Sequence, residues 1–262
     1  MIPEAAIIHW RNVVPWPQDA QVEQDLILCR ALIEIFRDPV VSKGALLRGG
    51  TALHKVLLRR ARRYSEDIDL VQASPGNIGP LIDAIRARLD PLLGEPRRER
   101  NPDNVTLRYR VQSEIPPIVP LRFKVEINTR EHFSVFDAEH RPFTVRSPWF
   151  EGSAELRTYA LEELLATKLR ALYQRRKGRD LFDLWTAGRR SSADPAKVIL
   201  AFRRYMERTG RNVSRETFEK NLAEKARSPE FTEDFRPLLT PGTRYDAQAA
   251  AQFVRERFLS RL

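Results

Sequence analysis

The chain has 262 residues, 42% hydrophobic and 31% charged, which is enough for one large domain or two modest ones. It contains no apolar run of about 18 residues and no basic N-terminal stretch leading into an apolar one, so we expect neither a membrane span nor a signal peptide. The single cysteine, Cys29, excludes an internal disulfide and a thiolate zinc site, and we expect a cytoplasmic protein.

The net charge of +10 is distributed unevenly along the chain. Residues 1–150 carry 22 basic and 19 acidic side chains, whereas residues 151–262 carry 23 and 16. Arginine dominates the basic excess of the second part, and its planar fork matches two phosphate oxygens. The charge favours a nucleic-acid partner; a merely solvated basic surface is the alternative.

The predicted elements change in kind along the chain. The first part has a helix over 18–37, a short strand, glycine turn and helix start over 46–55, an acidic strand over 64–71, a helix over 80–93, and strands over 105–111 and 121–128. Helices are predicted over 155–176, 178–188, 195–208, 214–227 and 246–261. We therefore expect an α+β fold, with a mixed-sheet catalytic domain over 1–150 and a helical domain over 151–262.

The acidic strand carries Asp67 and Asp69 two residues apart, so both carboxylates point to one face, roughly 6.6 Å apart along the strand. Two neighbouring acids resist joint ionisation unless cations meet them. Upstream, Gly49 and Gly50 allow close approach of a phosphate, and the Thr51 hydroxyl can cap the following helix near phosphate oxygens. Together these residues predict a Mg²⁺ site beside a triphosphate.

A third carboxylate is expected from a neighbouring strand. Glu126 shares the polar face of its strand with Lys124, while Val125 and its apolar neighbours take the other face. Glu126 is therefore the candidate for a metal ligand or for the acceptor of a proton from an attacking hydroxyl. Taken singly, Gly49-Gly50-Thr51 is commonly only a turn, and an Asp-x-Asp pair is commonly a solvated strand edge.

Lys168 lies within the apolar stripe of the helix predicted over 155–176. A lysine there either snorkels to solvent or meets an anion, such as a phosphate. Asp180 and Asp183 share one face of the next helix, and an acid returning toward Lys168 would orient the lysine or the nucleotide.

Four blocks in this order resemble the AbiEii/AbiGii toxin family of nucleotidyltransferases, which includes the mycobacterial MenT toxins and belongs to the DNA polymerase β-like superfamily. The blocks are Gly49-Gly50-Thr51-Ala52-Leu53-His54-Lys55, Ser65-Glu66-Asp67-Ile68-Asp69-Leu70, Lys168-Leu169-Arg170-Ala171-Leu172 and Arg179-Asp180-Leu181-Phe182-Asp183-Leu184. The resemblance covers about 46–185, and residues 186–262 match no motif of the family.

The resemblance implies a nucleotidyltransferase fold, an NTP site with two Mg²⁺ ions, and a toxin of a bacterial toxin–antitoxin or phage-defence pair with a cognate antitoxin. Some members add nucleotides to the 3′ end of tRNA and stop translation, so we expect NMP transfer to the tRNA acceptor end. By position, Asp67 and Asp69 hold metal, Lys168 is the essential lysine, Asp183 or Asp180 is the later acid, and Ser65 contacts phosphate. Lys55, in the first block, is a further candidate for nucleotide binding.

We expect the NTP to bind between the two domains, with Lys168 and Asp183 contributed by the helical one, and the basic surface to steer RNA. The RNA-binding candidates are Arg62, Arg63, Arg175, Arg176 and Lys177, together with Arg59, Arg60, Arg203 and Arg204. Arg59 to Arg63 read equally well as an ordinary exposed helix end. Two other functions remain open: transfer of a nucleotidyl or phosphoryl group to a protein or to the chain itself, and a non-catalytic module that binds NTP or RNA.

Overall fold

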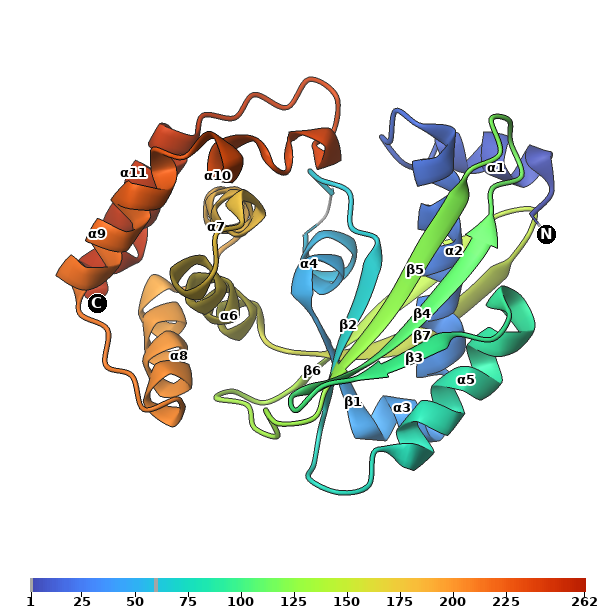
Figure 1. The fold of residues 1–262 in the computed structure, drawn as a ribbon, viewed down its shortest axis with the longest axis horizontal. Coiled ribbons are helices and arrows are strands. Elements are labelled where there is room, and N and C mark those ends of the chain that lie inside the picture. The colour runs from blue at the N-terminus through green and yellow to red at the C-terminus, as the bar shows by residue number, and fades with distance from the viewer. Residues whose placement is uncertain (1, 59–60) are drawn as a thin grey trace. The chain divides into compact units, whose positions relative to one another are not determined.

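The computed structural model describes residues 2–58 and 61–262, which form two compact units (Figure 1). The sheet unit comprises Met1–Ala52, Tyr64–Phe133 and Ala138–Tyr159. The helical unit comprises Leu53–Arg63, Ser134–Asp137 and Ala160–Leu262. Arg59 and Arg60, two of the RNA-binding candidates, lie outside the described residues.

One mixed sheet of seven strands forms the centre of the sheet unit within the described residues, in the order β3-β4-β5-β2-β1-β7-β6. The strands are β1 (Ala45–Arg48), β2 (Asp67–Gln72), β3 (Arg97–Arg100), β4 (Asn104–Gln112), β5 (Pro120–Asn128), β6 (Glu139–Arg146) and β7 (Glu151–Thr158). β2 runs parallel to β5 and antiparallel to β1, while β1 runs parallel to β7. This order places β2, the acidic strand, between β1 and β5.

Helices cover the apolar face of the sheet. They are α1 (Glu4–Arg11), α2 (Asp19–Phe36), α3 (Pro39–Gly44) and α5 (Gly79–Leu93), with a short turn of helix α4 (Gly49–Thr51) after β1. Alternation along the strands explains the choice of face: Ile68 and Leu70 of β2 are buried, whereas the alternating Asp67 and Asp69 are partly exposed. The long helix α2 packs against β5, β6 and β7 and against α5 (Figure 1).

The helical unit is built from amphipathic helices around an apolar and aromatic core. Its elements are the π-helix η1 (Ala52–Leu57, from its second residue), α6 (Leu161–Gln174), α7 (Gly178–Arg190), α8 (Pro195–Arg208), α9 (Arg215–Ala226), α10 (Pro229–Glu233), η2 (Arg236–Leu238), α11 (Ala247–Arg257) and η3 (Leu259–Arg261). Side-chain caps start three of them, since Asp194, Ser214 and Asp246 each accept a hydrogen bond from a backbone N–H of the first turn. Among the described residues, no helix is long and apolar enough to cross a membrane.

Two short segments outside the C-terminal part belong to the helical unit because buried polar groups tie them there. The buried Glu163 carboxylate accepts hydrogen bonds from the backbone N–H groups of Val135 (2.8 Å) and Phe136 (2.9 Å) and from the Tyr205 hydroxyl (2.8 Å). The segment 53–63 is held by its own side chains, as described below, and by the Thr240 N–H, which donates to the Arg62 carbonyl (3.1 Å).

The α+β class and the succession of a mixed sheet and helices are as predicted. The end of the sheet differs from the sequence-based boundary near residue 150, because β7 pairs with β1 and the sheet unit runs to Tyr159. The helix predicted over 155–176 is wrong in its first residues: residues 155–158 are strand, and α6 begins at Leu161. Leu47 and Thr158 are register partners, and the Thr158 hydroxyl donates to the Leu47 carbonyl (2.7 Å).

Candidate active site

Three carboxylates lie on the polar face of the sheet at two neighbouring strands. In the parallel register of β2 and β5, Asp69 is the partner of Glu126 and Asp67 is the partner of Lys124. Register partners point to the same face of a sheet, so Asp67, Asp69 and Glu126 share it. This is the arrangement that the alternation in each strand predicts, and the pairing of the two strands brings the acids together.

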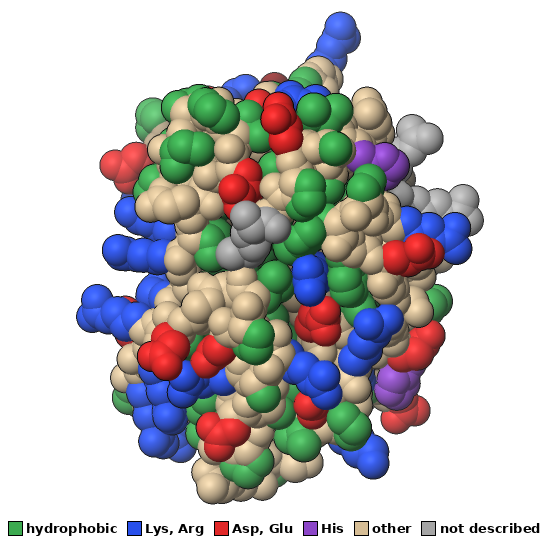
Figure 2. Space-filling model, turned by 90° about the vertical axis from the view of Figure 1, so that its right-hand side faces the viewer, with side chains coloured by type: hydrophobic (Ala, Val, Ile, Leu, Met, Phe, Trp, Pro, Cys, Tyr) green, Lys and Arg blue, Asp and Glu red, His purple; other side chains and the backbone are tan. Residues whose placement is uncertain are grey.

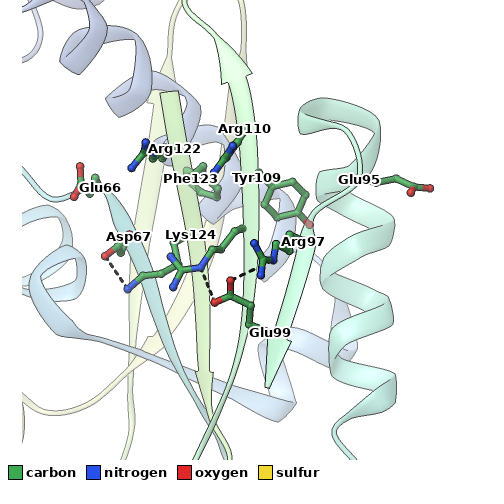
Figure 3. Close-up of a pocket in the computed structure, with 11 residues that line it drawn as sticks. Glu66, Asp67, Glu95, Arg97, Glu99, Tyr109, Arg110, Arg122, Phe123 and Lys124 are labelled. Atoms are coloured by element: carbon green, nitrogen blue, oxygen red, sulfur yellow. Dashed lines mark hydrogen bonds and ion pairs between the residues drawn. The ribbon is translucent and has the colours of Figure 1, made fainter. Parts of the chain in front are cut away.

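Lys124 forms ion pairs with this cluster of carboxylates, a role that the sequence did not predict for it. Its ammonium nitrogen lies 3.1 Å from Asp67 Oδ2 (Figure 3). The same nitrogen lies 3.5 Å from Glu126 Oε2. Partial burial raises the pKa of Asp67 to about 6, with Lys124 opposing and Asp69 adding to the rise. The pKa of Lys124 is raised in turn, because the three carboxylates outweigh the effect of its own burial. The group thus already stabilises a cation between two of its carboxylates.

Gly49 places the chain directly against Asp69. Its φ of +79° lies in the region that disfavours side chains, and a Cβ atom built there would overlap Asp69 Oδ2. The turn therefore needs glycine for two separate reasons, backbone conformation and space. The sequence predicts the first from Gly49-Gly50; the second depends on the antiparallel pairing that sets Arg48 opposite Asp69.

The Thr51 and Ser65 hydroxyls form a short chain of hydrogen bonds to the start of β2. The buried Thr51 hydroxyl donates to the Asp67 carbonyl (2.5 Å), and its oxygen lies 2.9 Å from Ser65 Oγ. Because a hydroxyl has one proton, Ser65 is the donor in the second bond. Both hydroxyls thus position the acidic strand in addition to lining the turn.

A second group of charged side chains lies inside the helical unit and surrounds Asp183. The Asp183 carboxylate accepts two hydrogen bonds from Arg63 (2.6 and 2.7 Å), one from His54 (2.8 Å) and an ion pair from Lys168 (2.8 Å), and none of its side-chain surface is exposed. Burial alone would raise the pKa of Asp183, but Arg63 and Lys168 hold it well below its usual range. Asp183 is therefore ionised, and its carboxylate can only accept hydrogen bonds.

His54 is fixed in one tautomer by this environment. Since Asp183 can only accept, His54 Nε2 carries the proton of their hydrogen bond. Burial lowers the pKa of His54 against the opposing effect of Asp183, and its Nδ1 has no hydrogen-bond partner among the described residues. The sequence reasoning gave His54 no role, although it lies in the first family block. The available signal was a histidine among the apolar residues Leu53 and Val56, four residues after Gly50.

Asp180 binds the other side of the same lysine. Its buried carboxylate accepts two hydrogen bonds from Arg175 (2.7 and 2.9 Å), and Lys168 Nζ lies 3.4 Å away. The expectation that an acid of α7 returns to Lys168 is met by both acids at once. The lysine side chain is only 7% exposed, so it does not snorkel to solvent.

The other predicted residues fall into different settings. Lys55 is half-exposed on η1 of the helical unit, whereas Gly49, Gly50, Thr51, Ser65, Asp67, Asp69 and Glu126 all belong to the sheet unit.

The RNA-binding candidates differ in exposure. Arg63 is buried against Asp183, in contrast to the exposed position that an RNA-binding side chain needs. Arg62 lies with Trp185, Arg189 and Arg244 around a hollow of about 430 Å³, and Arg176 and Lys177 are exposed. Arg203 donates to the carbonyls of Arg261 (3.2 Å) and Leu262 (2.7 Å), and Arg204 pairs with Glu207.

The acids of the sheet unit suit a hard cation by chemical type. Carboxylate oxygens are the ligands that Mg²⁺ prefers, and the Lys124 ammonium already stands between two of them. Within residues 2–58 and 61–262, however, no three His, Cys, Asp or Glu side chains are drawn together closely enough to form a ready-made metal site. A metal ion would therefore meet these carboxylates in competition with Lys124.

A glycine turn beside paired carboxylates on a mixed sheet is the arrangement expected of a nucleotidyltransferase, and comparison with known proteins gives the family. Residues 30–253 match the sequence profile of the nucleotidyl transferase AbiEii toxin family of type IV toxin–antitoxin systems. The chain belongs to this family and is a nucleotidyltransferase. The resemblance stated from the four sequence blocks is thereby confirmed.

Solved structures show the same fold at low sequence identity. The nucleotidyltransferase toxin MenT4 of Mycobacterium tuberculosis is similar over 100% of this chain and 91% of its own, with 19% identity and a TM-score of 0.70. JHP933 of Helicobacter pylori is similar over 90% of this chain and 89% of its own, with 20% identity and a TM-score of 0.55. No curated protein sequence gives a significant match.

Proposed function

We propose that the chain is a Mg²⁺-dependent enzyme that transfers NMP from an NTP to the 3′ end of an RNA, with tRNA as the acceptor. As a toxin it would thereby inhibit translation in the bacterial cytoplasm until a cognate antitoxin opposes it. The observation that carries the proposal is the shared face of Asp67, Asp69 and Glu126 beside Gly49. Family membership supports the reaction class and the toxin role; the RNA acceptor rests on the charge of the chain and on the family resemblance.

In the proposed reaction Asp67 and Asp69 would hold the Mg²⁺ ions, and Glu126 beside them would either complete the metal site or accept a proton. The bound ions supply positive charge that stabilises the charge developing on the triphosphate. Gly49 allows the triphosphate to approach the strand end, and Gly50, Thr51 and Ser65 line it. The terminal hydroxyl of the acceptor forms the new bond to the α-phosphorus, Glu126 accepts its proton, and pyrophosphate leaves.

We assign Lys168 to a phosphate of the nucleotide. Its ammonium has three N–H donors, and Asp180 and Asp183 take up two of them. The third is available for a phosphate oxygen, and the two buried acids keep the ammonium at a defined position. Asp180 and Asp183 are, on this assignment, positioning residues that act through Lys168, and Lys55 is a second phosphate contact from the same unit.

The test is transfer of label from each of the four α-³²P-labelled NTPs to total bacterial tRNA in the presence of Mg²⁺. The wild type runs beside Asp69→Asn, Lys168→Ala and, as a control, Glu151→Gln, whose carboxylate is 75% exposed on β7. We expect label on tRNA with the wild type and the control, and none with Asp69→Asn. Label on protein would replace the RNA acceptor with a protein one. NTP binding without any transfer, unchanged by Asp69→Asn, would favour a non-catalytic binding module.

A further inference from the structure

A hollow of about 850 Å³ lies over strands β3, β4 and β5 of the sheet unit and reaches Asp67 at one end (Figure 3). Its lining includes five cationic side chains, Arg97, Arg108, Arg110, Arg122 and Lys124, and four acidic ones, Glu66, Asp67, Glu95 and Glu99. Four of the five are arginines, the side chain whose planar fork binds two phosphate oxygens at once. The overall charge distribution did not point to this place, since residues 1–150 are almost balanced in charge.

The cations stand directly opposite one another in the sheet. Arg110 is the register partner of Arg122, Arg108 of Lys124, and Arg97 of Arg108. Like charges at directly opposite positions destabilise a sheet, so three such pairs in one region are a cost to folding. An anionic ligand bound between these side chains would offset their mutual repulsion.

Acidic neighbours neutralise only part of the group. Glu99 lies 2.8 Å from Arg108 and 3.5 Å from Arg97. Lys124 is paired with the carboxylates described above. Neither Arg110 nor Arg122 forms an ion pair with any described residue; both side chains are exposed, and they lie next to each other in Figure 3.

The hollow lies on one defined side of the catalytic carboxylates. In the strand order, β5 and β4 follow β2 on one side, whereas β1 and its Gly49 turn follow β2 on the other. A triphosphate held at the Gly49 turn and an anion held over β4 and β5 would thus reach Asp67 and Asp69 from opposite sides. The hollow thus lies on the side of the carboxylates that faces away from the Gly49 turn, and the exposed Arg110 and Arg122 favour an anionic ligand there. Figure 2 shows many Lys and Arg side chains along the left edge of the face that it draws.

We propose that Arg110 and Arg122, with Arg97 and Arg108 beside them, bind the backbone phosphates of a single-stranded nucleic-acid acceptor and lead its end to Glu126. The inference rests on the proposed function and deepens it by giving the acceptor a binding surface. Successive cations on one strand face are two residues, about 6.8 Å, apart, which provides repeated contacts along a strand that carries one charge per nucleotide. The shallow, exposed position of Arg110 and Arg122 suits a backbone rather than a base.

The experiment measures binding of a fluorescein-labelled 12-nucleotide single-stranded RNA by anisotropy at several salt concentrations. The variant is Arg110→Gln/Arg122→Gln in the full chain. The matched control is Arg98→Gln/Arg100→Gln, which removes the same charge from exposed positions of β3 that alternate with Arg97 and lie outside the hollow. Binding of each NTP with Mg²⁺ is measured by calorimetry for all three proteins, and Tm serves as the folding check.

We expect the Arg110/Arg122 variant to bind the RNA at least about tenfold more weakly and its salt slope to fall by about 1.4, or about 0.7 for each lost phosphate contact. The control should bind RNA nearly as the wild type does, and NTP binding should be the same in all three. Because opposed like charges are removed, the Tm of the Arg110/Arg122 variant should be equal or higher.

Equal loss of RNA binding in variant and control would overturn the proposal in favour of unspecific attraction, and unchanged RNA binding in the variant would overturn it outright. Weaker NTP binding in the variant would assign the hollow to the triphosphate instead. These binding results do not depend on turnover. A wild type that binds RNA through Arg110 and Arg122 but transfers no nucleotide would contradict the proposed function and leave the binding surface in place.

Discussion

The Arg63 guanidinium and the Asp183 carboxylate form a two-point ion pair inside the helical unit, with hydrogen bonds of 2.6 and 2.7 Å and 3% and 0% of their side chains exposed. The two residues are 120 positions apart in the sequence. Their pair fixes the segment that follows η1 to helix α7. It also gives the charge of Asp183 a structural role inside one unit, separate from any contact with substrate.

Removing the charge of Asp183 should lower the free energy of unfolding of the helical unit. Asp183→Asn removes the carboxylate that Arg63 binds at two points and leaves Lys168 with Asp180 alone, and loss of one partner of a buried pair costs about 3–5 kcal/mol. Urea denaturation followed by circular dichroism measures the change. A double variant, Arg63→Met/Asp183→Leu, should be more stable than Asp183→Asn because no buried charge of that pair is left alone. A loss below about 1 kcal/mol in Asp183→Asn would contradict the role given to the pair.

The same group predicts acid sensitivity. The pKa of Asp183 is held well below its usual range, and that of Asp180 is lowered, by their cationic partners against the effect of burial. The unfolded chain therefore binds more protons than the folded chain below about pH 5, so the free energy of unfolding should fall as the pH drops through the acid range. Asp183→Asn should show a shallower fall over the same range. An identical pH dependence in the two proteins would remove Asp183 as its source.

Gly49→Ala should strongly reduce transfer activity and lower the stability of the fold only moderately. The new Cβ would overlap Asp69 Oδ2 and displace a proposed metal ligand, in addition to the strain of φ +79°. Gly94→Ala is the matched control, since Gly94 has φ +77° and open space around its Cβ position. We expect both variants to lose about 1–2 kcal/mol of stability. Only Gly49→Ala should lose transfer activity, by about 100-fold or more. Equal activity in both would show that the clash is relieved.

Glu126→Gln tests the carboxylate that the register places beside Asp69. If Glu126 accepts the proton of the attacking hydroxyl, kcat should fall by about 10²–10⁴-fold. The amide keeps the size of the side chain, so RNA affinity should stay near that of the wild type. Single-turnover transfer and RNA anisotropy measure the two quantities. A variant that keeps its kcat would leave Glu126 as a neighbour of Asp69 without a part in the reaction.

Lys225 should stabilise the end of helix α6. Its ammonium donates to the carbonyls of Leu172 (2.5 Å) and Tyr173 (2.7 Å), in the last turn, where the helix carries partial negative charge. Lys225→Met keeps the length of the side chain but leaves these carbonyls without the donor, which should cost about 1–3 kcal/mol in urea denaturation. Wild-type stability after this change would mean that water replaces the lysine.

Lys225 also predicts an alkaline pH dependence. Burial lowers its pKa from 10.5 to about 8; the charge of Arg176 adds to this fall, and that of Asp180 opposes it. Between these values the unfolded chain binds more protons, so the free energy of unfolding should rise with pH from about 8 to 10. Lys225→Met should lack that part of the rise. A denaturation series in steps of half a pH unit compares the two slopes.

Local patterns in the sequence were sufficient for many elements of this protein. The bounds predicted for α8 are those of the structure, and those for β4, β5, α5 and α9 agree within one residue, because apolar spacing and caps are encoded locally. The edge strands β3 (Arg97–Arg100) and β6 (Glu139–Arg146) were not predicted. Both are rich in charged residues and carry little apolar signal, and only their partners β4 and β7 make them strands.

The sequence by itself determined which acids are presented together on a strand: alternation puts Asp67 and Asp69 on one face, and Glu126 on the polar face of its own strand. Only the tertiary structure decided which strands are neighbours, and hence that Glu126 stands beside Asp69 and Lys124 beside Asp67. It likewise decided that Arg63 and His54 meet Asp183 in the interior, and that Arg110 faces Arg122. The physical reason is range: alternation and helical periodicity act over a few residues, whereas strand pairing and buried ion pairs join residues that chain folding brings together from far apart.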